Sequence, residues 1–343
     1  MTASPRFFGG IHALRAVAAI LVVGEHAAYV ANHYTPIRMT SFGVVLFFAI
    51  SGFVISLQRT KSWTDFVQHR LLRIYPSYWL AMIVAAIGLT AIHSPVSASA
   101  SSLLLYPSTV SNSSLTIPYW TLAFEITFYA LASVAYRARL SDRTLTILAV
   151  VWILAVNLVA AAPDVGRYTF PGFPGILWSP AVQVFPMGVI CGIHFDHLRK
   201  LPRLAGLSAA LVAFCLSFAF PEYSSHKLLF LGVAATGLVL AVADLDLKSR
   251  LVATLGDASY GIYLLHFPAI IIAVRVLRVQ GLAWLPLYFA IGLIAGYAFG
   301  LLDCRLYRWL AANSSRIFRL PVRTQVPAPA TSDVIQRNQD RRS

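Results

Sequence analysis

The sequence has little charge for its length, and acidic residues are especially scarce. Only 12% of the 343 residues are charged, with 13 Asp and Glu against 27 Lys and Arg. Soluble domains carry about 25% charged residues, so a water-soluble fold of this length would lack side chains to cover its surface. With 58% hydrophobic residues, the class that fits is a polytopic membrane protein.

Other absences exclude further classes of protein. Three cysteines are too few for a disulfide scaffold, and an aromatic content of 13% argues against disorder. The sequence has no Walker loop and no dinucleotide-binding glycine motif, so ATP-driven transport has no support. The first apolar segment contains Arg15, Glu25 and His26, and it is therefore too polar for a cleaved signal peptide.

Apolar segments long enough to cross a bilayer as helices, about 20 residues each, recur along the chain. The predicted spans are residues 11–31, 41–57, 77–95, 118–136, 144–162, 175–194, 204–220, 227–243, 258–275 and 282–302. We therefore predict an all-α membrane helix bundle of about ten transmembrane helices. It forms one transmembrane domain over residues 1–310, and residues 311–343 have the composition of a basic, disordered cytoplasmic tail.

The placement of the basic residues predicts the orientation of these helices. A net charge of +14 also occurs in nucleic-acid-binding proteins, so placement decides between a membrane and a nucleic acid. Alternate loops and both terminal segments hold most of the Lys and Arg. The opposite loops hold only Arg38, Arg167, Lys227, Arg275 and Arg278. By the positive-inside rule, both termini are cytoplasmic, residues 94–118 are the longest outer loop, and the chain crosses the inner cell membrane with no nucleic-acid partner.

Ionisable residues inside the spans are the candidates for function, because each costs about 2.5–3.5 kcal/mol to insert. Arg15 and His26 are eleven residues apart, which places them on nearly the same helix face and about 16 Å apart along the axis. Glu125, on an oppositely directed helix, is predicted at a depth similar to that of His26. A carboxylate level with an imidazole is typical of an oriented general base, although a structural hydrogen bond between helices fits too. Glu25 points about 100° away from His26 and receives no role.

Six stretches carry a family resemblance through their order along the chain. They are RAVAAILVVGEH (15–26), FFAISGFVIS (47–56), HRLLRIYPSYWL (69–80), IPYWTLAFEITFY (117–129), the weaker VFPMGVICG (184–192) and GDASYGIYLLHFP (256–268). Together they resemble the acyltransferase 3 family of membrane acyltransferases. The similarity covers about residues 10–305, and the ordered set is more specific than any single stretch.

The resemblance implies an integral membrane O-acyltransferase that moves an acyl group, commonly acetyl, from cytoplasmic acyl-CoA to a hydroxyl of a cell-surface or exported glycan. It implies acyl-CoA as a donor substrate, with no permanently bound cofactor and no metal. The family's critical residues fall on Arg15 and His26, its Arg-x-x-Arg pair on Arg70 and Arg73, and its Trp-x-x-x-x-Glu motif on Trp120 and Glu125. Relatives often have an acidic residue at the position of Val45, which departs from the pattern.

These residues suggest a mechanism. His26 is predicted to take the hydroxyl proton while the oxygen attacks the thioester carbonyl, and Glu125 to stabilise the imidazolium that forms. Arg15, Arg70 and Arg73 are predicted to bind CoA phosphates at the cytoplasmic edge. Cytoplasmic arginines also set topology and contact anionic lipid, so Arg70 and Arg73 fit either role.

Several alternatives remain open. Ser51 suits either a covalent relay or close helix packing. Tyr263 and His266 share a helix face and either line a cavity or pack it. For the whole protein, a secondary transporter or flippase is the rival class, because intramembrane Glu and His also form proton relays. An acyltransferase that acts on a small secondary metabolite is a third possibility.

Overall fold

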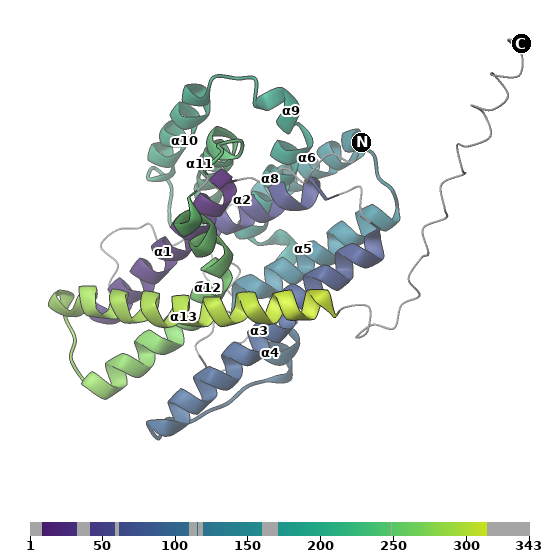
Figure 1. Ribbon diagram of the computed structural model, residues 1–343. Coiled ribbons are helices and arrows are strands. Elements are labelled where there is room, and N and C mark those ends of the chain that lie inside the picture. Colours follow the sequence, from purple (N-terminus) through teal and green to yellow (C-terminus); the bar gives the residue numbers. More distant parts are fainter. Residues whose placement is uncertain are drawn as a thin grey trace, which may run out of the picture. The chain divides into compact units, whose positions relative to one another are not determined.

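The computed structural model describes residues 9–32, 42–58, 62–109, 115, 119–159, 171–247 and 249–313. Every regular element in these ranges is a helix, which confirms the predicted all-α fold (Figure 1). The chain falls into two units, Met1–Tyr307 and Arg308–Ser343, and the site belongs to the first. Most of the predicted tail, from residue 314 onward, lies outside the described residues, so its disorder stays a prediction.

The helices have the following bounds along the chain. The α-helices are α1 (Gly9–Asn32), α2 (Phe42–Ser56), α3 (Trp63–Ala91), α4 (Ala100–Leu104), α5 (Tyr119–Arg137), α6 (Asp142–Val159), α8 (Val184–Ile193), α9 (Phe195–Leu198), α10 (Arg203–Ser217), α11 (Ser225–Val242), α12 (Arg250–Leu277) and α13 (Leu285–Ala312). The 3-10 helices are η1 (Gly175–Trp178), η2 (Pro180–Gln183) and η3 (Leu282–Trp284). Each of the ten predicted spans overlaps a helical segment of the described residues.

Among the described residues, six helices are long and apolar enough to cross a membrane: α1, α3, α6, α11, α12, and η3 with α13. Three apolar segments are shorter, namely α2, η2 with α8, and α10. Helix α5 contains Glu125 and several Tyr and Thr residues, which lower its hydropathy. The fold is therefore that of a multi-pass membrane helix bundle, while the count of ten spans and the cytoplasmic termini stay predictions.

Two helices begin earlier than the hydropathy of the sequence predicts. Helix α3 begins at Trp63 and has Asp65 in its first turn. A carboxylate at this end of a helix interacts favourably with the helix dipole. Helix α12 begins at Arg250, and the Ser249 side chain caps it by accepting from the backbone N–H of Val252. Both helices therefore begin in polar sequence before their apolar spans. There, a first-turn carboxylate or a capping side chain stabilises the helix start that hydropathy does not indicate. As a result, Arg70 lies on a helix and not on a loop.

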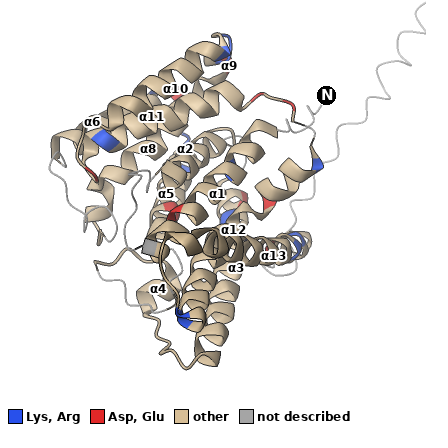
Figure 2. Ribbon diagram, turned by 90° about the vertical axis from the view of Figure 1, so that its left-hand side faces the viewer, with Lys and Arg blue, Asp and Glu red and all other residues tan. Residues whose placement is uncertain are grey.

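Helix α1 packs against α12, α2 and α11, and α2 packs against α8 (Figure 1). Figure 2 shows that charged residues are few and scattered over these helices. Small residues let the helices approach closely. A Cβ at Gly256 of α12 would lie 2.6 Å from the backbone oxygen of His12, and one at Gly261 would lie 2.3 Å from the Cα of Gly300. Glycine contacts therefore hold α12 closely against both α1 and α13.

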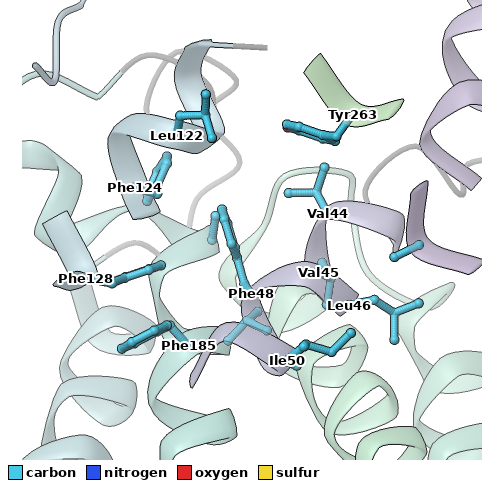
Figure 3. Close-up of a cluster of buried hydrophobic side chains, with 14 of the residues drawn as sticks. Val44, Val45, Leu46, Phe48, Ile50, Leu122, Phe124, Phe128, Phe185 and Tyr263 are labelled. Atoms are coloured by element: carbon cyan, nitrogen blue, oxygen red, sulfur yellow. The ribbon is translucent and has the colours of Figure 1, made fainter. Parts of the chain in front are cut away.

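Aromatic and branched side chains fill the space between α2, α5 and α8 (Figure 3). Phe128 of α5 stacks on Phe185 of α8 with ring centroids 4.0 Å apart and planes 9° apart. Phe48 of α2 meets Phe128 edge to face. Val45 is 1% exposed and belongs to this apolar cluster. An apolar side chain at position 45 therefore suits its surroundings, where an acidic one would be desolvated.

Candidate active site

A cavity of about 330 Å³ lies between α1, α2, α3, α5 and α12. Its lining includes the polar side chains of Arg15, Arg70, Arg73, Glu125, Tyr129 and Tyr260. The fold thus brings together four of the five predicted site residues, which come from three separate helices. The fifth, His26, is not among the residues that line this cavity.

Arg15 projects from α1 into the cavity and is partly buried. Within the described part of the chain, its guanidinium forms no hydrogen bond and no ion pair. The charges that act on it belong to Arg73, Asp257 and Glu125. A guanidinium without a partner on a cavity wall retains all its donors, so Arg15 is suited to bind an anionic group there.

Arg70 of α3 is held by neutral groups. Its Nη2 donates a hydrogen bond of 2.9 Å to Oε1 of Gln58. The guanidinium lies over the rings of Phe66 and Tyr129, at 5.3 Å and 4.9 Å from their centroids. These contacts orient the group without compensating its charge, and Arg70 therefore also remains available to an anion.

Arg73, one turn further along α3, has its charge compensated inside the protein. Its Nη1 lies 2.8 Å from Oδ2 of Asp303, whose side chain is fully buried. The Ser77 hydroxyl donates to the other carboxylate oxygen of Asp303, and the Arg73 guanidinium lies 4.8 Å from the centroid of the Tyr260 ring. The two arginines of the Arg-x-x-Arg pair therefore differ, since Arg73 ties α3 to α13.

Glu125 faces the same cavity and not the predicted partner. Its Oε1 accepts a hydrogen bond from the hydroxyl of Tyr129, one turn later on α5. In the described chain no hydrogen bond joins Glu125 to His26. The sequence argument matched the depths of the two residues along their helices, but depth does not fix the side of the helix to which a side chain points. The structure thus gives His26 a different neighbour.

That neighbour is His266 of α12. The Nδ1 atom of His26 lies 3.1 Å from Nε2 of His266 and 3.0 Å from the backbone oxygen of Val22. The His26 ring also packs on Phe267, with centroids 4.4 Å apart. His266 is fully buried, and its Nδ1 lies 2.9 Å from the backbone oxygen of Ile262. His266, which is fully buried, and His26, which is partly buried, therefore form one pair although they are 240 residues apart.

Tyr263 lies between this histidine pair and the cavity. It lines the cavity, its ring centroid is 6.0 Å from that of His266, and it contacts Phe47 of α2 edge to face at 5.5 Å. The Tyr263 hydroxyl is hydrogen-bonded to that of Thr121. The histidine pair and the arginine-lined cavity are thus adjacent regions of one site, divided by an aromatic wall.

His26 and His266 occupy matching positions along their helices. His26 lies 17 residues after Gly9, the first residue of α1, and His266 lies 16 residues after Arg250, the first residue of α12. If both helices enter the membrane from the same side, the two imidazoles lie at equal depth in the bilayer, roughly 24–26 Å along the axis from the start of each helix. The predicted spans begin at residues 11 and 258 and place the two histidines 15 and 8 residues from their starts, so the match in depth appears only once the structure gives the true start of α12.

Comparisons with known proteins identify the family of the chain. Residues 8–302 match the family model described as "Acyltransferase domain". The chain is 30% identical over 276 residues to the "Exopolysaccharide production protein ExoZ" of Rhizobium meliloti (strain 1021), covering 73% of this chain and 82% of that protein. It is 24% identical over 268 residues to the "Acyltransferase MdmB" of Streptomyces mycarofaciens, covering 67% and 68% respectively. No solved structure matches it. The chain belongs to the acyltransferase 3 family, and it is a membrane O-acyltransferase.

Proposed function

We propose that the protein transfers an acyl group, with acetyl as the first candidate, from acyl-CoA to a hydroxyl of a cell-surface or exported glycan. The observation that carries this proposal is the cavity in which the guanidinium groups of Arg15 and Arg70 make no ion pair within the described residues. Acyl-CoA is a polyanion at its nucleotide end and uncharged at its thioester end. Arginine forks bind phosphate in bidentate fashion, and the uncharged wall beyond them suits the acyl arm.

The donor is proposed to enter from the side on which Arg15 and Arg70 lie. A volume of about 330 Å³ is at the lower end of the range for ligand sites, which suits the acyl-pantetheine arm better than the whole nucleotide. The apolar wall of Val44, Phe47 and Ile50 would exclude water from the thioester. Glu125 is proposed to act within this cavity, where its negative charge and its hydrogen bond with Tyr129 help to place the arginines.

His26 is proposed as the general base. It takes the proton from the acceptor hydroxyl while the hydroxyl oxygen attacks the thioester carbonyl carbon. The carbon–sulfur bond then breaks, and the leaving CoA thiolate receives the proton that the imidazolium returns. The step needs no other reactant, because the proton lost by the acceptor ends on the thiol of CoA.

A glycan acceptor is supported by one relative. The printed name of ExoZ assigns it to exopolysaccharide production, and exopolysaccharide hydroxyls are acceptors of the proposed chemistry. We expect this chain to act on a glycan of the same broad class, on the outer side of the inner cell membrane.

The test uses the purified protein in lipid nanodiscs, with acetyl-CoA and a panel of hydroxylated glycans. Release of free CoA thiol, together with acetylated glycan in the mass spectrum, is the expected result. Movement of a solute across vesicles without CoA release would instead support a transporter. Acylation of a small metabolite but of no glycan would refute the glycan acceptor while keeping the acyltransferase activity.

A further inference from the structure

The buried histidine pair allows the tautomer of each ring to be assigned from its neighbours. A neutral imidazole has one N–H donor and one nitrogen acceptor. His266 Nδ1 lies 2.9 Å from the backbone oxygen of Ile262, and a carbonyl oxygen only accepts. His266 therefore carries its hydrogen on Nδ1, and its Nε2 is the acceptor.

The same reasoning fixes His26. Its Nδ1 lies 3.0 Å from the Val22 oxygen and 3.1 Å from Nε2 of His266, and both of these atoms are acceptors. The hydrogen of His26 must therefore be on Nδ1. The opposite assignment would place lone pairs against each other at the contacts with Val22 and Ile262, which costs free energy in a buried site.

The consequence concerns the second nitrogen of His26. With the hydrogen on Nδ1, the basic lone pair is on Nε2. That atom makes no hydrogen bond in the described residues, and it is not among the side-chain atoms that are fully enclosed without a partner. His26 is only partly buried, and Phe267 packs on its ring. The lone pair is thus open to an incoming group.

We propose that His266 is a positioning residue, which holds His26 in the tautomer and orientation that present Nε2 to the acceptor hydroxyl. The inference rests on the proposed role of His26 as the general base. When Nε2 takes the proton, Nδ1–H donates to His266 from an imidazolium, and a hydrogen bond from a charged donor is stronger than the neutral one. His266 thereby fills the supporting role that the sequence argument gave to Glu125.

The kinetic test compares two substitutions at His266. In His266→Gln the side-chain carbonyl can still accept from Nδ1 of His26, whereas His266→Leu has a similar size and no acceptor. We expect His266→Leu to lower kcat by about 100-fold or more, as an incorrect tautomer does in other general-base enzymes, with the KM for acyl-CoA unchanged. His266→Gln should recover most of that loss. His194→Leu is the matched control, because it removes a comparable contact of 3.0 Å with Thr146 outside the site, and its kcat should equal that of the wild type.

The structural test does not depend on activity. Protein labelled with ¹⁵N-histidine is compared with labelled His26→Gln protein, so that the signals missing from the variant report the His26 tautomer. We expect the Nδ1–H form in the wild type. An Nε2–H form would overturn the proposal, as would a folded His266→Gln as inactive as His266→Leu. If His26→Ala kept its kcat, the proposed role of His26 as the base would fail, whereas the NMR spectrum of labelled His266→Leu, compared with the wild type, would still decide whether His266 and not the Val22 carbonyl alone fixes the tautomer.

Discussion

Arg15 and His26 lie on one face of α1 but contact different parts of the site. Arg15 lines the cavity without a partner, and His26 contacts His266. If Arg15 binds a CoA phosphate equally in the ground and transition states, Arg15→Ala should raise the KM for acyl-CoA by about 10- to 100-fold with little change in kcat. Steady-state kinetics with varied acyl-CoA measure both constants.

His26→Ala should affect kcat, whereas Arg15→Ala affects the KM for acyl-CoA. Loss of a general base lowers kcat by about 100- to 10,000-fold, while donor binding, measured by calorimetry, should stay close to the wild-type value. Arg203→Ala serves as a control, because Arg203 pairs with Asp244 at an exposed position. Loss of CoA binding in His26→Ala, or a collapse of kcat in Arg15→Ala with KM unchanged, would contradict this division of roles.

Glu125 is the residue for which the sequence and the structure suggest different roles. Its carboxylate accepts from Tyr129 and makes no hydrogen bond with His26 in the described chain. We therefore expect Glu125→Gln to alter the KM for acyl-CoA, because it removes a negative charge from the arginine-lined cavity. Its kcat should stay within about tenfold of the wild-type value, which is a smaller decrease than removal of a general base causes. Tyr129→Phe is the comparison, because it removes the hydrogen bond to Glu125 but keeps the negative charge, and its KM for acyl-CoA should therefore stay closer to the wild-type value. A kcat as low as that of His26→Ala would restore the imidazolium-stabilising role.

At the scale of the helices, the ion pair between Arg73 and Asp303 connects α3 with α13. Arg73→Ala leaves a fully buried carboxylate without a cation, which should lower the free energy of unfolding by about 3–5 kcal/mol. A double substitution of Arg73→Met with Asp303→Leu should recover much of that loss, since it removes both buried charges. Thermal unfolding in detergent provides the measurement.

Arg70→Ala is the internal comparison for this ion pair. Arg70 contacts Gln58 and two aromatic rings but no carboxylate in the described residues, so its removal leaves no unpaired charge. We expect near wild-type stability with a raised KM for acyl-CoA. If the double substitution were no more stable than Arg73→Ala, the unpaired carboxylate of Asp303 would not be the cause of the lost stability.

At the scale of the whole molecule, the predicted orientation places Ser97 outside and Ala138 inside the cell. Both positions are exposed in the structure and are suitable for cysteine labelling once Cys191, Cys215 and Cys304 have been replaced. An impermeant thiol reagent should modify Ser97→Cys in intact cells, and Ala138→Cys only after the membrane is permeabilised. Labelling of Ala138→Cys in intact cells would reverse the orientation and place the arginine-lined cavity on the wrong side for cytoplasmic acyl-CoA.

The sequence by itself determined the class of protein, the family and, apart from the early starts of α3 and α12, the positions of the helices. Hydropathy, capping and motif order are local properties, so they can be read without knowing which helices are neighbours. The family motifs marked Arg15, Arg70 and Glu125 as site candidates, but the predicted spans left Arg70 in a loop, and the cavity that these residues share follows only from the tertiary structure.

Only the tertiary structure decided which side chains meet. Arg73 pairs with a residue 230 positions away, and His26 with one 240 positions away. Such pairs depend on how each helix is rotated about its axis and tilted against its neighbours. That arrangement is set by packing at contacts such as Gly256 against His12, and no local pattern encodes it. For this reason the sequence identified His26 but not the residue that orients it.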